Sequence, residues 1–432
     1  NMKLSLVGIG AMLRPDDGAA KIVRLIPGGP AETDGRLKEG DKIIAVTQED
    51  GEEQSIMHWP LYKAVRLIRG EKDTKVVLTV ISESDGNNSR SKKIDLIRDE
   101  VKLEEQAAKG DVRSIKTSSG VNRNIGIITL PDFYADFNAT NAKEKDARRA
   151  STDIQRIIQD LQKEQIEGLI LDLRNNGGGS LVEAIEIAGL FIPSGPIVQV
   201  KERRSLKILP DADPEVNYSG PLIILVNRLS ASASEILAAA LQDYNRAIII
   251  GDEHTHGKGT VQTLMPLGKK KGSLKLTTAS YYRINGGSTQ LRGVEPDIII
   301  PSMVDIMDIG EKELQNALPW DTIRPALYRT NKGYDDIIPA LTEASMKRRN
   351  QDSEFQVFLD KRNKLKERYA SKTVSLVLSN RLAEAEIDDY LDGRDDEDDE
   401  ADDLILKETL QIFGDWLDLE NESEVEIATI DL

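Results

Sequence analysis

The residues best suited to chemistry lie in a serine- and alanine-rich stretch from position 227 to 243. An apolar run ends at Val226, and the stretch after it opens an alanine-rich helical segment. Ser232 stands where that helix would begin, and the free backbone N–H groups and the helix dipole there favour developing negative charge. Ser232 is therefore a candidate nucleophile. Serine is also a common helix cap, so capping alone is the second interpretation.

A serine nucleophile needs a base, and the first candidate is Lys258. This lysine stands between two glycines just after an apolar run, which is an unusual place for a solubilising charge. Lysine acts as a base only when it is neutral, so its site has to be desolvated or lack a carboxylate partner. Gln262 lies four residues further on, on the same side of either a strand or a helix. Its neutral amide could orient the amine.

Two histidines offer a different chemistry in the same segment. His254 and His256 precede the lysine, and a Ser-His pair is the commoner arrangement in hydrolases. A His-x-His pair on a strand could also ligate a metal together with Asp252. The remaining histidine of the chain is His58, far away in sequence. Two loop histidines without a chemical role are the alternative to both interpretations.

A glycine-rich turn adds a site for an anion. Residues 175–179 follow an apolar strand-like run and read Asn-Asn-Gly-Gly-Gly, and a helical pattern begins after Ser180. Such a turn presents backbone N–H groups to negative charge. Phosphate binding is one interpretation, although the spacing matches neither the P-loop nor the dinucleotide fingerprint. An oxyanion hole for a tetrahedral intermediate uses the same physics.

The pattern around these residues predicts an α/β sheet as their scaffold. Between about residues 94 and 301, apolar strand-like runs alternate with helical segments. The predicted strands are 125–130, 168–173, 222–226 and 247–250, and the predicted helices are 147–163, 181–191 and 232–243.

Two further regions flank this unit. Residues 4–80 read as a small, mostly β domain, with strands at 20–26 and 75–81 and helical segments at 31–34 and 61–68. The region from 304 to 432 is charged and helix-rich, and its acidic run at 395–400 is typical of a solvated linker. Apolar residues from Leu404 to Trp416 then predict an amphipathic helix that docks on another part of the protein or on a partner.

Composition narrows the chemistry. The 432 residues contain no cysteine, which excludes disulfides, thiolate metal sites and a cysteine nucleophile. Three histidines argue against a histidine-rich metal enzyme, and a formal charge of −17 argues against nucleic-acid binding by the whole chain. No apolar run is long enough to span a bilayer. The sequence starts almost inside a strand-like run, so we expect it to be part of a longer precursor.

Several long motifs in a fixed order resemble the C-terminal processing (tail-specific) proteases of peptidase family S41, and among them the bacterial Prc/Tsp-like branch. The resemblance covers about residues 4–320. Its motifs are residues 175–179, 230–243, 257–262, 282–290, 293–297 and 316–321. Members of this family are serine endopeptidases with a Ser-Lys dyad and a PDZ domain that senses substrate C-termini.

The resemblance implies roles for the matching residues. Ser232 would be the nucleophile, Lys258 its general base, and Gln262 the residue that positions the base. The segment before the lysine, residues 252–256, is one residue longer than the family's usual approach and replaces a proline and an aromatic residue. A small bulge would absorb the extra residue, and the histidine base stays open as an alternative.

The family's oxyanion hole would map to the backbone N–H of Ala233 and to that of Gly178 or Gly179. Asp243 matches an aspartate that is sometimes grouped with the catalytic dyad. It lies 11 residues beyond the serine, which is about 16 Å along a helix, so it cannot touch the nucleophile. We expect it to support the fold near the site or to pair with Arg246.

The N-terminal region resembles a PDZ module of the permuted bacterial type. The loop of Gly8, Ile9, Gly10 and Ala11 would bind the terminal carboxylate of a peptide through the N–H groups of its last three residues. The peptide would add as a strand, with its last side chain in an apolar pocket. The alternative is a strand merely interrupted by glycines.

These inferences predict a multi-domain α/β protein. Its parts are a PDZ-like, β-rich domain at 1–82, an α/β protease core at 83–303 with a linker at 83–124, and a helical C-terminal region at 304–432 with an acidic linker near 386–403. We expect a serine endopeptidase without metal or cofactor. The rival interpretations are a non-catalytic PDZ scaffold or chaperone for unfolded chains, and a Ser-His hydrolase of small esters.

The resemblance also implies where and on what the protein works. Its substrates would be unfolded or tail-exposed proteins, and no nucleic acid would take part. It would act in the bacterial periplasm, with the export signal outside this chain, and would be peripheral to the inner membrane, with an adaptor lipoprotein as a partner. Binding of a substrate tail to the PDZ domain would align Lys258 with Ser232.

Overall fold

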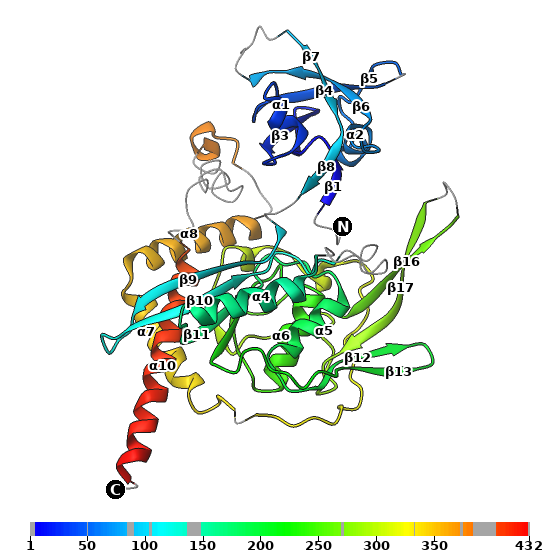
Figure 1. The fold of residues 1–432 in the computed structure, drawn as a ribbon. Coiled ribbons are helices and arrows are strands. Elements are labelled where there is room, and N and C mark those ends of the chain that lie inside the picture. The colour runs from blue at the N-terminus through cyan, green and yellow to red at the C-terminus, as the bar shows by residue number, and fades with distance from the viewer. Residues whose placement is uncertain are drawn as a thin grey trace. The chain divides into compact units, whose positions relative to one another are not determined.

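The computed structural model describes residues 5–49, 51–83, 90–102, 106–135, 148–268, 272–331, 333–371, 375–382 and 403–430. The chain forms two compact units, Lys3–Ala107 and Ala108–Leu432 (Figure 1). The predicted acidic linker at 395–400 lies outside the described residues.

The first unit is a small β-rich domain. An antiparallel sheet runs in the order β2-β3-β4-β6-β7, with β5 beside β4, while β1 pairs with β8 in a separate ribbon. Its core is one apolar cluster that extends from Ile9 to Leu96. The elements are β1 (Ser5–Gly8), β2 (Ala11–Asp16), β3 (Ala19–Leu25), α1 (Pro30–Asp34), β4 (Lys42–Gln48), β5 (Gln54–Ser55), α2 (Leu61–Ile68), β6 (Lys75–Ile81), β7 (Lys92–Ile97) and β8 (Asp99–Lys102).

The second unit is built on a six-stranded sheet in the order β18-β15-β14-β11-β10-β9, parallel except for β9. Its elements are β9 (Lys109–Lys116), β10 (Asn122–Thr129), α4 (Ala150–Lys163), β11 (Gly168–Asp172), α5 (Leu181–Gly189), β14 (Leu222–Val226), α6 (Ala233–Asp243), β15 (Ile248–Gly251) and β18 (Ile298–Ile299). The predicted α/β alternation is therefore confirmed.

The sheet brings two of the predicted site segments together. Strands β11 and β14 are neighbours, and Asp172 lies opposite Leu225 in their register. The glycine turn follows β11 and the serine turn follows β14, so both leave the sheet at the same carboxyl edge. In open α/β sheets this is the edge where ligands bind.

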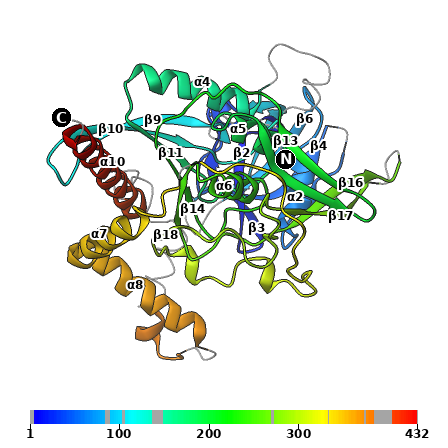
Figure 2. The same ribbon diagram turned by 90° about the horizontal axis from the view of Figure 1, so that it is seen from below.

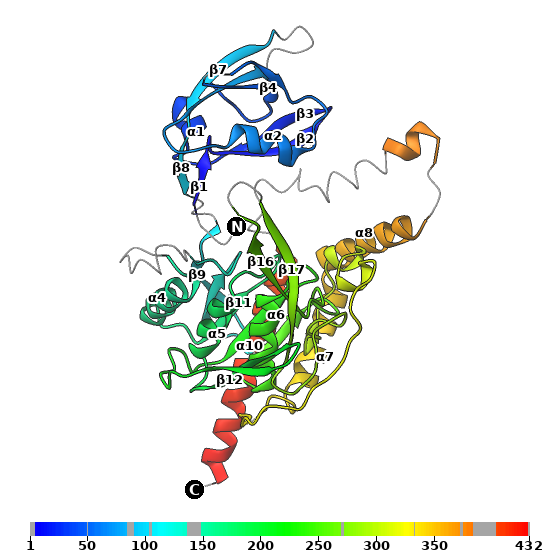
Figure 3. The ribbon, with the colours of Figure 1, turned by 90° about the vertical axis from the view of Figure 1, so that its right-hand side faces the viewer.

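A second, antiparallel sheet carries the lysine. Its order is β13-β12-β17-β16, and Figure 3 shows β16 and β17 as a long hairpin. Lys258 lies between β15 of the first sheet and β16 of the second. The strands are β12 (Gly195–Glu202), β13 (Leu206–Asp211), β16 (Thr260–Pro266) and β17 (Ser273–Tyr282).

The C-terminal region covers the open face of the parallel sheet. Helices α4, α5 and α6 contact one another along one face, and apolar residues of α7, α8 and α10 cover the other (Figure 2). The elements are the 3-10 turns η3 (Val304–Ile306) and η4 (Glu311–Glu313) and the helices α7 (Ile338–Gln351), α8 (Ser353–Ala370) and α10 (Leu404–Ile430). Of the described helices, none combines the length and apolarity needed to cross a membrane.

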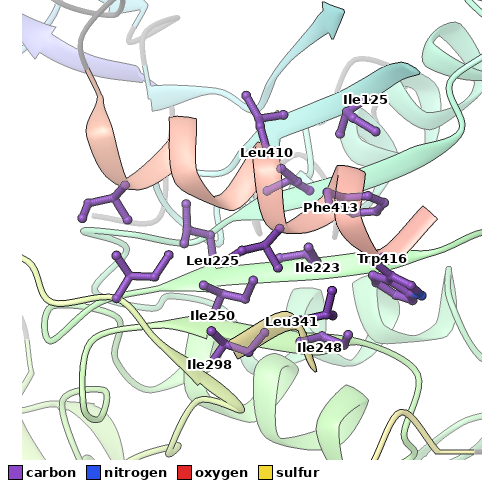
Figure 4. Close-up of a cluster of buried hydrophobic side chains, with 14 of the residues drawn as sticks. Ile125, Ile223, Leu225, Ile248, Ile250, Ile298, Leu341, Leu410, Phe413 and Trp416 are labelled. Carbon is purple, nitrogen blue, oxygen red and sulfur yellow. The ribbon is translucent and has the colours of Figure 1, made fainter. Parts of the chain in front are cut away.

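Helix α10 confirms the amphipathic helix expected after the acidic run. Its Leu410, Phe413 and Trp416 point into the apolar cluster on the sheet, where Figure 4 places them above Ile223 and the neighbouring strand residues. Phe413 and Trp416 are fully buried. Burial of a large side chain contributes about 1.5–3 kcal/mol, so this helix is part of the core and not an appendage.

Candidate active site

Ser232 sits at a strained turn. It is the residue immediately before α6, and its backbone has φ 58° and ψ −108°. A positive φ is unusual for a residue with a side chain and costs on the order of 1–3 kcal/mol, so the surrounding structure has to enforce it. The serine is half-buried at the carboxyl edge of the sheet, with the free N–H groups of α6 beside it.

The buried carboxylate of Glu235 joins the serine turn to the lysine segment. Its Oε2 accepts the N–H of Ser232 at 2.7 Å and that of Lys258 at 3.1 Å. Its Oε1 accepts the N–H of Gly257 and the hydroxyl of Thr255, both at 2.7 Å. Burial raises the pKa of Glu235 to about 7, although these hydrogen bonds act in the opposite direction. Two segments more than 20 residues apart thus share one acceptor.

Glu235 was not among the residues singled out in the sequence. The signal was present, because Ser-x-x-Glu at the start of a helix is the capping-box spacing. That pattern predicts the bond from Glu235 to the N–H of Ser232 but not the bonds to the lysine segment, which depend on the tertiary fold.

Lys258 is half-buried, in surroundings that favour its neutral form. Burial lowers the pKa of its amine, and the positive charge of Lys275 lowers the pKa further, while Glu311 and Glu235 act in the opposite direction. Its carbonyl accepts hydrogen bonds from Tyr281 and, at 2.9 Å, from Thr289. The backbone of the lysine is therefore fixed, which leaves the side chain as the movable part.

The two glycines beside the lysine are needed for close packing. A Cβ on Gly259 would lie 2.8 Å from the backbone nitrogen of Gln290, and Gly257 has φ +89°. Among the described residues no hydrogen bond joins the amine of Lys258 to the hydroxyl of Ser232. Catalytic hydrogen bonds often close only when substrate is bound.

The glycine turn packs directly on the serine turn. A Cβ on Gly178 would lie 2.8 Å from the Cβ of Ser232 and 3.1 Å from the nitrogen of Ala233, so only glycine fits there. The fully buried Asn176 fixes this approach, because its carbonyl accepts the N–H of Ala231 at 3.0 Å and the hydroxyl of Ser234 at 2.9 Å.

Of the two candidate glycines, Gly178 is the one that approaches Ala233. Its N–H donates to the side-chain oxygen of Asn176 at 2.9 Å. Gly179 lies instead against Phe133, with which it forms a parallel β-bridge. The N–H of Gly178, which is the nearest candidate donor, is therefore held by Asn176 in this structure.

Asp243 lies at the far end of α6 from the serine. Its carboxylate forms an ion pair with Arg283 at 2.6 Å and accepts from the amide of Asn285 at 2.8 Å. The expectation that it pairs with Arg246 was wrong, because that guanidinium donates to the carbonyls of Phe191 and Tyr218. The ion pair between Asp243 and Arg283 ties α6 to the end of β17.

Gln262 lies in β16 just after a bulge between Val261 and Gln262, and its side chain is exposed. In the part of the chain that the structure describes, no hydrogen bond links it to the amine of Lys258. The structure therefore brings Ser232, Ala233, Gly178 and Lys258 into one site, with Gln262 at its margin.

The ring of His254 is engaged by other groups, whereas in the described part of the chain the ring of His256 is not. His254 contacts the guanidinium of Arg228 through Nε2 at 2.6 Å and the carbonyl of Thr255 through Nδ1 at 2.5 Å. His256 donates its backbone N–H to the carbonyl of Ser230, and its ring Nδ1 is buried without a hydrogen-bond partner among the described residues. Burial lowers the pKa of both rings. Within the described residues, no group of three or more His, Asp or Glu side chains is arranged to hold a metal.

The predicted carboxylate loop lies between β1 and β2 of the first unit. The carbonyl of Ile9 accepts the N–H of Ala31 at 2.8 Å, and that of Gly10 accepts the N–H of Ile26 at 2.9 Å. Gly10 has φ +74°, and a Cβ there would lie 2.9 Å from the Cα of Gly29. After the loop, β2 is an edge strand of its sheet, as a peptide that adds as a strand requires.

Family models match three parts of the chain. Residues 2–81 match the PDZ domain, residues 124–300 match peptidase family S41, and residues 304–394 match the C-terminal domain of tail specific protease. The first match covers most of the β-rich unit and contains the predicted carboxylate loop, and the second contains the serine, lysine and glycine-turn segments.

Whole-chain comparisons give the same family. The chain is 37% identical to the tail-specific protease of Haemophilus influenzae over 99% of its own length and 63% of that protein. It is 32% identical to the carboxyl-terminal-processing protease of Synechocystis sp. over 73% of its own length and 68% of that protein.

Among solved structures, the chain resembles the PDZ domain of a carboxy-terminal protease from Vibrio cholerae in complex with peptide. The two are 41% identical over 23% of this chain and all of that one, with a TM-score of 0.22. It also resembles a photosystem II D1 C-terminal processing protease, with 28% identity over 69% of this chain and 72% of that one and a TM-score of 0.41. Because of its sequence identity to these proteases and its match to the family model, this chain belongs to the carboxyl-terminal-processing proteases of peptidase family S41.

Proposed function

We propose that this protein is a serine endopeptidase in which Ser232 and Lys258 form the catalytic dyad. The chain spans 63% of the length of the tail-specific protease of Haemophilus influenzae that it matches. We therefore propose, by analogy with that protein, that this chain cleaves proteins. The main support for the dyad is the carboxylate of Glu235, which accepts hydrogen bonds from the backbone N–H groups of both Ser232 and Lys258.

Neutral Lys258 takes the proton from Ser232 Oγ as that oxygen attacks the peptide carbonyl. The oxyanion is held by the backbone N–H groups of Ala233 and of the glycine turn, which donate to the charge that develops there. The C–N bond then breaks, and the protonated lysine gives its proton to the leaving amine. Water attacks the acyl-enzyme with Lys258 again as the base, which releases the acid and regenerates the serine.

Gly178 is the better candidate for the second oxyanion donor, because it adjoins both Ser232 and Ala233. In this structure its N–H is held by Asn176. We propose that substrate binding redirects that N–H toward the oxyanion. Gln262 would orient the lysine only after a rearrangement of β16, and Asp243 acts through the fold.

We further propose that substrates are proteins with accessible C-terminal tails, bound by Gly8–Ala11 and the free edge of β2. The chemistry of the loop supports this, since backbone N–H groups at a glycine turn suit a carboxylate. The family relationship supports the periplasm as the compartment, with an adaptor lipoprotein and peripheral membrane contact as further proposals.

The test is cleavage of an unstructured protein such as casein by the wild-type chain, Ser232→Ala and Lys258→Ala. We expect both variants to be folded and inactive. Lys207→Ala serves as the control, because this lysine is exposed on β13 and pairs with Glu202. Full activity of Lys258→Ala would exclude the dyad, and an inactive but chain-binding wild type would favour the scaffold interpretation.

A second experiment tests tail recognition. Peptides with one sequence and either a free or an amidated C-terminus should differ in affinity, because only the free carboxylate can accept from the loop. Equal affinity of the two peptides would exclude the carboxylate-binding role of Gly8–Ala11.

A further inference from the structure

The acidic residue just before the last described helix reaches the active-site turn. Asp403 precedes α10 and lies beyond the part of the chain that matches the C-terminal domain of tail specific protease. Its carboxylate caps α10, since Oδ1 accepts the N–H of Leu406 at 3.0 Å. The same carboxylate extends to the sheet and binds Arg174, 229 positions earlier.

Arg174 is held between two carboxylates. Its Nη1 and Nη2 donate to Asp403 at 2.9 and 2.5 Å, and its Nε and Nη2 donate to Asp172 at distances from 2.6 to 3.1 Å. The guanidinium is well buried, with 18% of the side chain exposed. A planar arginine fork bound on two sides has a fixed orientation, and charge-assisted bonds of this type are about twice as strong as neutral ones.

The backbone of Arg174 leads straight into the candidate oxyanion turn. The next residue, Asn175, donates its N–H to the side chain of Asn227 at 3.0 Å, and Asn176 then binds the serine turn. Gly178 follows within the same turn. Fixing Arg174 at one end therefore fixes the path of the backbone that carries the oxyanion donor.

The rest of α10 gives this contact a rigid base. Arg348 of α7 binds Glu408 at 2.9 Å and Asp415 at 2.7 Å, and the apolar side of the helix is part of the core of the sheet. Asp403 is thus presented by a helix that cannot shift without disturbing several buried groups.

We propose that Asp403 is a positioning residue that holds Arg174 and thereby the oxyanion turn, so that the last helix completes the active site. This inference rests on the proposed serine-protease function. It assigns a catalytic contribution to a segment more than 100 residues beyond the sequence that matches peptidase family S41.

The variant that tests this proposal is Asp403→Asn. Asparagine caps a helix as well as aspartate does, so α10 keeps its start while Arg174 loses one charged partner. The matched control is Glu354→Gln, which also converts a carboxylate to an amide and removes a 3.1 Å ion pair between α8 and α10, with Lys407. Asp403→Glu keeps the charge and should recover part of the activity.

The readouts are kcat and KM on a peptide and the rate at which a fluorophosphonate labels Ser232. In that labelling the Oγ–P bond forms, the P–F bond breaks, and the serine proton leaves with fluoride through the base. We expect Asp403→Asn to lower kcat and the labelling rate about tenfold, within the usual range of coupling through a second residue. KM and the melting temperature should stay close to wild type, and Glu354→Gln should change neither rate.

Hydrogen exchange separates this proposal from the proposed function. Backbone amides of residues 174–179 should exchange faster in Asp403→Asn than in the wild type or in Glu354→Gln, whether or not the chain cleaves peptides. Unchanged exchange there would overturn the positioning role, as would a wild-type kcat in Asp403→Asn. Absence of Ser232 labelling in the wild type would instead count against the proposed function.

Discussion

The side chain of Glu235 accepts the backbone N–H of Lys258 at 3.1 Å, although the two residues lie 23 positions apart in the chain. The same carboxylate accepts the N–H of Ser232, the residue immediately before α6, so the proposed nucleophile and the proposed base share one buried acceptor. An acceptor shared in this way makes the geometry of the site depend on a residue that does not itself react.

We expect Glu235→Gln to destabilise the second unit and to lower activity. The amide NH₂ would face backbone N–H groups that need an acceptor, and a buried unsatisfied group costs about 1–3 kcal/mol. Urea denaturation gives the change in the free energy of unfolding, and kcat on a peptide gives the loss of activity, which should exceed tenfold. Wild-type stability in this variant would exclude the shared acceptor.

The pH dependence of that destabilisation has a definite sign. Burial raises the pKa of Glu235 to about 7 in the folded chain, against 4.5 for an unperturbed glutamate. Between these values the folded state binds more protons than the unfolded state, so the contribution of Glu235 to stability falls as the pH rises from about 4.5 through 7. The difference in unfolding free energy between wild type and Glu235→Gln should therefore be larger at pH 5 than at pH 8.

The pH profile of kcat/KM should report the lysine base. In the proposed dyad only neutral Lys258 accepts the serine proton, so activity should rise with pH along a limb set by its lowered pKa. Lys275→Met removes a charge that lowers this pKa, so the limb should move to higher pH. Glu311→Gln removes a charge that raises it, so the limb should move to lower pH. Shifts in the same direction for both variants would contradict the assignment.

Asp243→Asn should affect stability and leave the chemistry intact. Breaking its buried ion pair with Arg283 is expected to cost about 3 kcal/mol. The rate of Ser232 labelling by a fluorophosphonate, measured on folded protein, should stay within about twofold of wild type, because the aspartate lies at the opposite end of α6. Asn285→Ala, which keeps the ion pair but removes one hydrogen bond to the same carboxylate and one from the N–H of Gly287, should cost about 2 kcal/mol. A labelling rate lowered 100-fold in Asp243→Asn would assign it a catalytic role.

His254→Ala should retain activity. Both ring nitrogens are engaged, by Arg228 and by the carbonyl of Thr255, so the ring has no free position with which to act as a base. We expect kcat/KM on a peptide to stay within about threefold of wild type, with a loss of stability of about 1 kcal/mol. An inactive, folded variant would support the Ser-His interpretation with His254 as the base.

Gly10→Ala should weaken tail binding alone. The new Cβ would lie 2.9 Å from the Cα of Gly29, at a residue with φ +74°. The strain of about 1–2 kcal/mol for a side chain in this conformation should distort the loop. Fluorescence anisotropy with a labelled peptide should show at least tenfold weaker binding, whereas the labelling rate of Ser232 should not change. Unaltered peptide affinity would place the carboxylate site elsewhere.

The sequence predicted the elements whose apolar residues form a clear pattern. Strand β14 has the predicted bounds of 222–226 because its five residues are an uninterrupted, fully buried apolar run. Helix α2 has the predicted bounds of 61–68 because its apolar residues recur at helical spacing. The antiparallel sheet with β13 and β17 was not foreseen. Most residues of these two strands are exposed, and the alternation of apolar and polar residues is short in both, at 206–208 and 273–277.

The parts of the site that depend on residues close together in the sequence were predictable, and the contacts between distant residues were not. Ser232 and the glycine turn are visible as strand–turn–helix patterns, and their proximity follows from the neighbouring strands β11 and β14. The partner of Asp243 is Arg283, 40 positions away, and no local pattern distinguishes it from the nearer Arg246. The contact between Arg174 and Asp403 is equally invisible, because it depends on the return of α10 to the sheet.

Helix α10 also affects the order in which the second unit can fold. Its Phe413 lies beside Gly168, where even a Cβ would have no room, so this pair closes a loop of more than 240 residues. Contacts of such long range form late, because the entropy of closing the loop has to be overcome before they contribute. Until then one apolar face of the sheet stays open to solvent. Under the proposed role of Asp403, a chain at that stage also lacks its finished oxyanion turn, and the protease becomes competent only when folding is complete.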